Sequence, residues 1–158
     1  MIRLSAFSLS LRHRQSGVAA VEFAIIAILF FTLLLGIMEF GRWLFLLNGA
    51  NEATRLGARL GVVCSIENDP DFRIRTRMSE MTGGGIPAVN MDLQYDPAGC
   101  TVETCRTVTA RIVGANFTPI SPFFGGNFAI PEFPTSLPRE YMNSDGNPAC
   151  PGGPPLIP

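Results

Sequence analysis

An uncharged apolar run near the N-terminus constrains this chain more than any other feature of its sequence. No charged residue occurs from Phe23 to Met38, and apolar character resumes after Glu39 and Arg42 as far as Leu47. A hydrocarbon core of about 30 Å needs about 20 helical residues, so this stretch is long enough to cross it. The length of the run disfavours the alternative, a buried helix of a soluble protein. We therefore expect a transmembrane helix in contact with membrane lipid.

The charges that flank the run predict its orientation. Arg3, Arg12 and Arg14 precede it, and no acidic residue occurs before Glu22. Positive flanks stay cytoplasmic, so the N-terminus is expected inside and the rest of the chain outside. In a bacterium this topology means a single-pass inner-membrane protein with a periplasmic C-terminal domain, where its four cysteines would be oxidised.

The basic residues exclude several kinds of chemistry. All twelve Lys and Arg positions are arginine, and the one histidine, His13, lies in the basic N-terminal stretch. A Walker-type phosphate loop and a Schiff-base lysine are therefore excluded. A net charge of -1 does not indicate the basic surface that binds nucleic acid. We expect no cofactor, no metal and no enzymatic activity. A rival periplasmic hydrolase would need paired acids flanking a cleft, drawn from Asp92, Asp96, Glu132 and Glu140.

A secretory signal peptide carries its cleavage site, a pair of small residues, after the apolar run. In this chain the small residues lie before the run. Gly17 is followed by Val18, with Glu22 and Phe23 five and six residues beyond the glycine. This pattern resembles the type IV prepilin processing motif, in which a membrane peptidase cuts after glycine. The resemblance implies cleavage between Gly17 and Val18 and loss of the basic leader, residues 1–17. Without His13, the mature chain could run no Ser-His or Cys-His nucleophile and no histidine-ligated zinc.

Beyond the processing motif, the chain from Ala19 to Gly61 is similar to the TadE-like family of pseudopilins of the tight-adherence (Tad) pilus. The resemblance implies a minor pilin that is needed to assemble or prime the pilus. Whether such a subunit is also incorporated into the extracellular pilus stays open at this point. It implies four partners: the prepilin peptidase, an inner-membrane assembly platform, the major pilin and other pseudopilins. The matching motifs are EFGR and R-x-GAR, formed by Glu39, Phe40, Gly41, Arg42, Arg55, Gly57 and Arg59.

Three charged residues on the expected helix are candidates for a role in assembly. Glu22 is an acid at the edge of an apolar helix, where burial of its charge is expensive without a partner. Cleavage after Gly17 would create an amine on Val18, and by resemblance Glu22 of a neighbouring subunit would pair with it. A glutamate that simply reaches headgroup water remains the alternative. Glu39 and Arg42 are spaced to form an ion pair near the outer interface, with or without functional consequence.

The helix is expected to continue past the membrane, because no proline occurs before Pro70. We assign residues 18–66 to a transmembrane and stalk helix. A ridge of small residues that lets another backbone approach closely is formed by Gly49, Ala53, Gly57 and Gly61. The ridge has two possible partners, a helix of another subunit or the outer domain of the same chain.

The composition changes near residue 67, and all thirteen prolines follow that point. We expect an α+β domain over 67–142 and a Pro/Gly-rich tail over 143–158. Residues 72–81 suit a short helix. Strands are expected over 88–95 and 106–113, paired as a β-hairpin because both alternate apolar and polar residues.

Four cysteines allow three disulfide pairings, and the sequence does not choose among them. We favour Cys100 with Cys105, because their separation suits a small loop, which leaves Cys64 with Cys150. The second bond would fasten the tail to the end of the long helix and contribute about 4 to 5 kcal/mol. A zinc site is disfavoured because CxxxxC without a CxxC pair or histidine is a poor ligand pattern.

An aromatic, proline-rich segment spans 117–133. Its Phe123, Phe124 and Phe128 would form a partner-binding patch if exposed, but we favour burial beneath the hairpin. Prolines at 131, 134 and 138 make a regular last strand doubtful. An uncleaved, membrane-anchored adhesin or binding module remains the alternative function.

Overall fold

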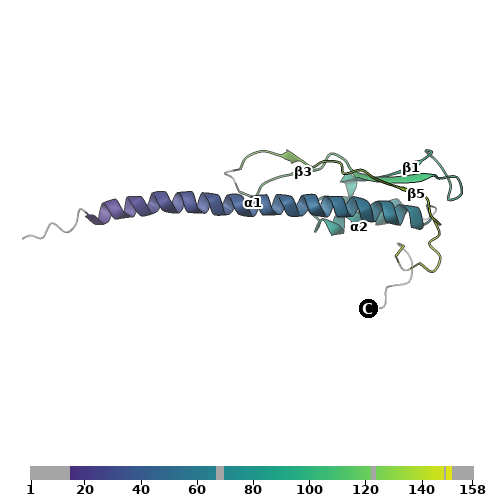
Figure 1. Cartoon of the computed structure of the whole chain (residues 1–158), viewed down its shortest axis with the longest axis horizontal. Helices are drawn as coiled ribbons and strands as arrows, with labels where there is room; N and C mark the ends of the chain where they lie inside the picture. The colour runs from purple at the N-terminus through teal and green to yellow at the C-terminus, as the bar shows by residue number, and fades with distance from the viewer. Residues whose placement is uncertain (1–14, 67–69, 122–123, 148, 151–158) are drawn as a thin grey trace, which may run out of the picture. The chain divides into compact units, whose positions relative to one another are not determined.

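The structure of this chain, a computed structural model, has the α+β fold that the sequence indicates (Figure 1). It describes residues 15–66, 70–121, 124–147 and 149–150. Most of the expected leader, Phe123 and the end of the tail from residue 151 lie outside the described residues. The chain divides into two compact units, Met1–Met38 and Glu39–Pro158. The elements are α1 (Gln15–Val63), α2 (Pro70–Met81), the 3₁₀ helix η1 (Ala88–Asn90), β1 (Met91–Asp96), β2 (Thr107–Ile112), β3 (Asn116–Phe117), β4 (Phe128–Ala129) and β5 (Thr135–Pro138).

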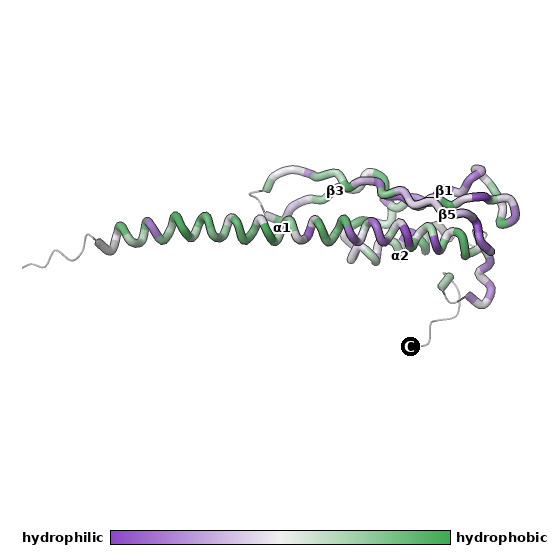
Figure 2. Tube along the Cα trace, in the orientation of Figure 1, coloured by the Kyte–Doolittle hydropathy of each residue, from purple (hydrophilic) through white to green (hydrophobic). Residues whose placement is uncertain are grey.

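The long helix α1 forms without interruption, as the absence of proline predicts. Among the described residues, it is the one helix long and apolar enough to cross a membrane. Figure 2 shows a nearly continuous hydrophobic stretch in its N-terminal half. Between residues 17 and 38 no side chain is buried, whereas buried positions recur from Leu46 to Val62.

The expected β-hairpin is confirmed. Strand β1 pairs antiparallel with β2, from Met91 opposite Ile112 to Asp96 opposite Thr107. The first strand begins later than expected because residues 88–90 form the 3₁₀ turn η1. Apolar residues on one face of the hairpin are buried, so the alternation seen in the sequence separates the core from the outer polar face.

The expectation that prolines would prevent a regular last strand is wrong. Strand β5 pairs antiparallel with β2, so the sheet order is β1-β2-β5 and β5 is an edge strand. Ile112 donates its N–H to Glu132, which shows that even-numbered residues of β2 turn their backbone groups toward β5. By the same alternation, Pro138 directs its nitrogen to the free edge. Proline has no backbone N–H, but at this position no hydrogen bond between β2 and β5 is lost.

The ridge of small residues packs within its own chain. A Cβ atom added to Gly49 would lie 3.2 Å from the carbonyl oxygen of Met81, and one added to Gly61 would lie 2.7 Å from Cγ1 of Val108. At Gly57 the added atom would collide with the side chain of Met78. The outer domain, instead of a helix of another subunit, therefore covers this ridge.

Two disulfides close the outer domain, and they join the cysteines that we favoured. Cys64 bonds to Cys150 with Cα atoms 5.5 Å apart, and Cys100 bonds to Cys105 with Cα atoms 4.9 Å apart. Both sulfurs of the first bond are buried at the C-terminal end of α1. This disulfide joins positions separated by 86 residues, so it ties the end of the described chain back to the helix.

Strands β3 and β4 form a separate two-stranded sheet, with Phe117 opposite Phe128. We call residues 114–121 and 124–131 the β3–β4 arm (Figure 1). Phe128 is 48% exposed and Phe124 is half-buried. The preference for a buried aromatic cluster is therefore wrong for Phe128. Two residues per strand give this small sheet too little area to cover its outward side chains.

Candidate assembly surfaces on the long helix

The proposed processing site lies in the first turns of α1. Gly17 and Val18 are both exposed, and a Cβ atom added to Gly17 would meet no atom within 4 Å. Glu22 follows Val18 by four residues, which places the two on the same helix face one turn apart. Phe23 is 73% exposed. This end of the helix is accessible, and its one carboxylate is within a turn of the amine that cleavage would create.

The helix between the processing site and Met38 exposes bulky apolar side chains on all sides. Monomeric soluble proteins rarely expose contiguous apolar patches of more than a few hundred Å². We therefore expect lipid or another protein to cover this surface. Those exposed are Val18, Val21, Phe23, Ile25, Ile26, Ile28, Leu29, Phe30, Phe31, Leu33, Leu34, Ile37 and Met38.

Glu39 is the first acidic residue after this surface, and its carboxylate has three hydrogen-bond donors. Oε2 accepts from Arg42 at 2.8 Å, so the expected ion pair forms. Oε1 accepts the backbone N–H groups of Ile120 at 2.8 Å and Ser121 at 2.9 Å. Only 13% of the Glu39 side chain is exposed. The carboxylate therefore binds the β3–β4 arm to α1.

Aromatic rings add further contacts between this turn of α1 and the arm. The guanidinium carbon of Arg42 lies 5.3 Å from the ring centroid of Phe117, a cation–π contact with the arm. Trp43 lies 6.3 Å from the ring of Phe128 and 5.9 Å from that of Phe40. One turn of α1 thus holds both strands of the arm through charge, backbone hydrogen bonds and ring contacts.

No sequence pattern indicated these contacts, because 81 residues separate Glu39 from Ile120. Local spacing showed the ion pair with Arg42 but not the second, long-range set of donors. A carboxylate that must be satisfied at the end of an apolar run was the clue available. It would have predicted a partner without identifying it.

The remaining motif residues divide between the surface and the core. Arg55 pairs with Glu52 at 3.3 Å, and both side chains are more than half exposed. Arg59 is exposed as well. Gly57 is buried against Met78 and Ala53 is fully buried, so both act within the fold. The structure therefore separates arginines that face solvent from small residues that allow the domain to pack.

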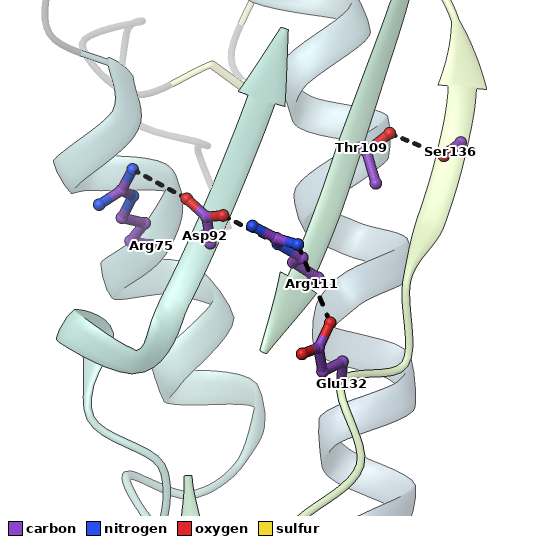
Figure 3. A network of polar contacts seen from close by, with 6 residues as sticks. All are labelled: Arg75, Asp92, Thr109, Arg111, Glu132 and Ser136. Carbon is purple, nitrogen blue, oxygen red and sulfur yellow. Dashed lines mark hydrogen bonds and ion pairs between the residues drawn. The ribbon is translucent and has the colours of Figure 1, made fainter. Parts of the chain in front are cut away.

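Of the four acids that a hydrolase would use, Asp92 and Glu132 share one arginine, and Asp96 and Glu140 lie elsewhere in the outer domain. Asp92 lies 3.0 Å from Arg111 and 3.8 Å from Arg75, and Arg111 also reaches Glu132 at 3.9 Å (Figure 3). This network occupies the polar outer face of the sheet, where Thr109 and Ser136 also share a hydrogen bond of 2.7 Å. Asp96 and Glu140 line two other surface depressions. Arginine-bridged acids of this kind suit a structural network that links α2 to the sheet.

Comparison with known families concerns the helix alone. Neither a curated protein nor a solved structure matches this chain. The family model described as "TadE-like protein" matches residues 17–59, which extend from Gly17 through both arginine motifs. The match thus covers most of α1 and both of its surfaces, the exposed apolar one and the one that packs on the domain. Over residues 17–59 the chain is similar to TadE-like proteins, the family that its motifs indicated.

Proposed function

We propose that this protein is a minor pilin of a Tad adherence pilus, stored in the bacterial inner membrane and assembled through its N-terminal helix. The TadE-like match at residues 17–59 carries the proposal, because it covers the processing motif and the exposed apolar surface on one continuous helix. The N-terminus would be cytoplasmic and the outer domain periplasmic. Membrane lipid would cover the helix before assembly and other subunits would cover it afterwards.

Assembly would proceed by packing, without a catalytic step in this chain. The prepilin peptidase would cut after Gly17, and the new amine of Val18 would pair with Glu22 of a neighbouring subunit. Both residues are exposed on α1, so such a contact requires no rearrangement of the outer domain. The major pilin, other pseudopilins and an inner-membrane assembly platform would supply the remaining contacts.

The N-terminal sequence of the membrane-extracted protein tests the processing step. We expect it to begin at Val18. The Gly17→Val variant should retain its leader while folding normally, because nothing packs against Gly17. Gly41→Ala is the matched control, since Gly41 is also exposed on α1 with no atom near its added Cβ. A mature wild-type chain that retains residues 1–17 would contradict the proposal and favour the uncleaved membrane-anchored adhesin or binding module.

The pilus itself tests the assignment. We expect deletion of this protein to reduce surface pili and adherence, and the wild-type chain processed at Gly17 to restore them. Co-purification with sheared pili would place the subunit in the filament. Normal pili in the deletion strain would contradict a role in assembly.

A further inference from the structure

The β3–β4 arm places exposed apolar side chains at the level where the helix surface changes from apolar to charged. Ile120 is 75% exposed, Phe128 is 48% exposed and Phe40 of α1 is 54% exposed. We call these three residues, together with the half-buried Trp43, the interfacial patch. Phe40 follows Glu39 in α1, the ring of Trp43 lies next to that of Phe128, and the Glu39 carboxylate binds the arm at this turn through the amides of Ile120 and Ser121.

Helix length sets the position of this patch relative to a bilayer. From Val18 to Met38 a helix rises about 31 Å at 1.5 Å per residue. This length matches the hydrocarbon core of about 30 Å. Glu39 is the next residue, and from there on α1 belongs to the outer unit, with Leu46 buried in its core. The uncharged part of the helix thus ends at Met38, although exposed apolar side chains continue on α1 as far as Phe45, within the stretch to Leu47 that the sequence suggested.

We propose that the β3–β4 arm lies on the outer surface of the membrane while the subunit is stored there, with the interfacial patch in contact with lipid headgroups and the adjoining acyl chains. Aromatic residues collect at this level in membrane proteins because their rings suit the headgroup region. The proposal rests on the membrane span of the proposed function, but not on a role in the pilus.

The contacts of Glu39 fit this location. A carboxylate near hydrocarbon is expensive unless it is paired and hydrogen-bonded. Arg42 and the two arm amides supply three donors to Glu39, so the side chain can stay ionised at the membrane surface. Those same bonds direct the backbone of the arm toward α1, and the side chain of Ile120 remains outside. The carboxylate thus acts as a positioning group for an apolar contact.

Depth-dependent fluorescence quenching tests the proposal in the full chain. The sequence contains one tryptophan, so Trp43→Phe provides a background without tryptophan. Into it we would introduce Ile120→Trp and reconstitute the protein at low density in phosphatidylcholine vesicles. Lipids brominated near the headgroup end of the acyl chain should quench this variant several-fold more than lipids brominated near the chain terminus.

Two matched variants separate the possible failures. Tyr141→Trp replaces a side chain that is 79% exposed, between Glu140 and Met142, whose amides bond to Val62. Val62 lies about 35 Å along the helix from Glu39, so this variant should not be quenched. Ile28→Trp lies midway between Val18 and Met38 and should be quenched most by bromine near the chain terminus.

The outcomes distinguish the arm from the span. If Ile28→Trp is quenched and Ile120→Trp is as unaffected as Tyr141→Trp, the span holds and the arm proposal is overturned. This is also the result expected if a neighbouring subunit, instead of lipid, covers the patch. Strongest quenching of Ile120→Trp by deep bromine would also overturn an interfacial position. Absence of quenching in Ile28→Trp would overturn the span, and the arm proposal with it.

Discussion

The N-terminal half of α1, up to Met38, and its C-terminal half, from Glu39 to Val63, belong to one helix but meet different surroundings. In the first half bulky apolar side chains are exposed throughout. In the second half the buried face runs from Leu46 to Val62 and combines leucine and valine with alanine, glycine and threonine, over which α2 and the sheet pack closely. Apolar composition alone therefore does not tell which part of a helix faces lipid. What decides it is whether the outer domain packs over the side chains, as it does from Leu46 to Val62.

The largest effect on folding should come from the disulfide at the end of the second half. Replacing Cys64 and Cys150 by alanine should lower the free energy of unfolding by about 4 to 5 kcal/mol, because the bond closes a long loop. The same double change at Cys100 and Cys105 should cost about 2 kcal/mol in the chain-entropy model. Denaturant unfolding in detergent would measure both. Equal losses would contradict a stabilisation that depends on loop length.

A methyl group should distinguish a packed glycine from an exposed one. Gly61→Ala should lower the free energy of unfolding by about 1 to 3 kcal/mol, because the added carbon presses against the buried, β-branched Val108. Gly41→Ala should raise it by up to about 1 kcal/mol through helix propensity. Thermal unfolding of the two variants would show shifts of opposite sign. A stabilised Gly61→Ala variant would mean that the domain does not pack on the ridge.

Two Glu–Arg pairs with the same spacing allow a matched test of the Glu39 contact. Glu39→Ala removes the acceptor of two arm amides, so hydrogen exchange at Ile120 and Ser121 should accelerate by about tenfold. Glu52→Ala breaks only an exposed pair with Arg55 and should leave those amides unchanged. Exchange followed by mass spectrometry would measure both variants. Unchanged exchange in Glu39→Ala would show that the arm is held by its ring contacts alone.

The smallest effect on folding should come from the first half of the helix. Glu22→Gln should leave the unfolding of the outer domain unchanged, because Glu22 is exposed and belongs to the other unit. Incorporation into pili should nevertheless fall sharply if Glu22 pairs with the amine of a neighbouring subunit. N-terminal sequencing would show whether processing is intact, and sheared pili would show incorporation. Normal incorporation of the variant would remove the pairing role.

Long-range contacts explain where prediction from the sequence failed. The doubt about the last strand arose because prolines were judged without knowing which edge they face, and β5 turns Pro138 to the free edge. Burial of Phe128 was expected from its apolar character, although a sheet with two residues per strand cannot cover it. The first outcome depended on a partner strand elsewhere in the chain, and the second on the small size of the two-stranded sheet.

The sequence by itself determined the features that short-range physics controls. The uninterrupted helix, the apolar length that suits a membrane and the Glu39–Arg42 pair depend on neighbours within a few residues. The hairpin was visible in the alternation of apolar and polar residues within each of its strands. The tertiary structure decided what faces the small-residue ridge and what binds the free oxygen of Glu39. Each of these contacts joins segments far apart along the chain, and the side chains meet only when burial of the shared core brings the segments together.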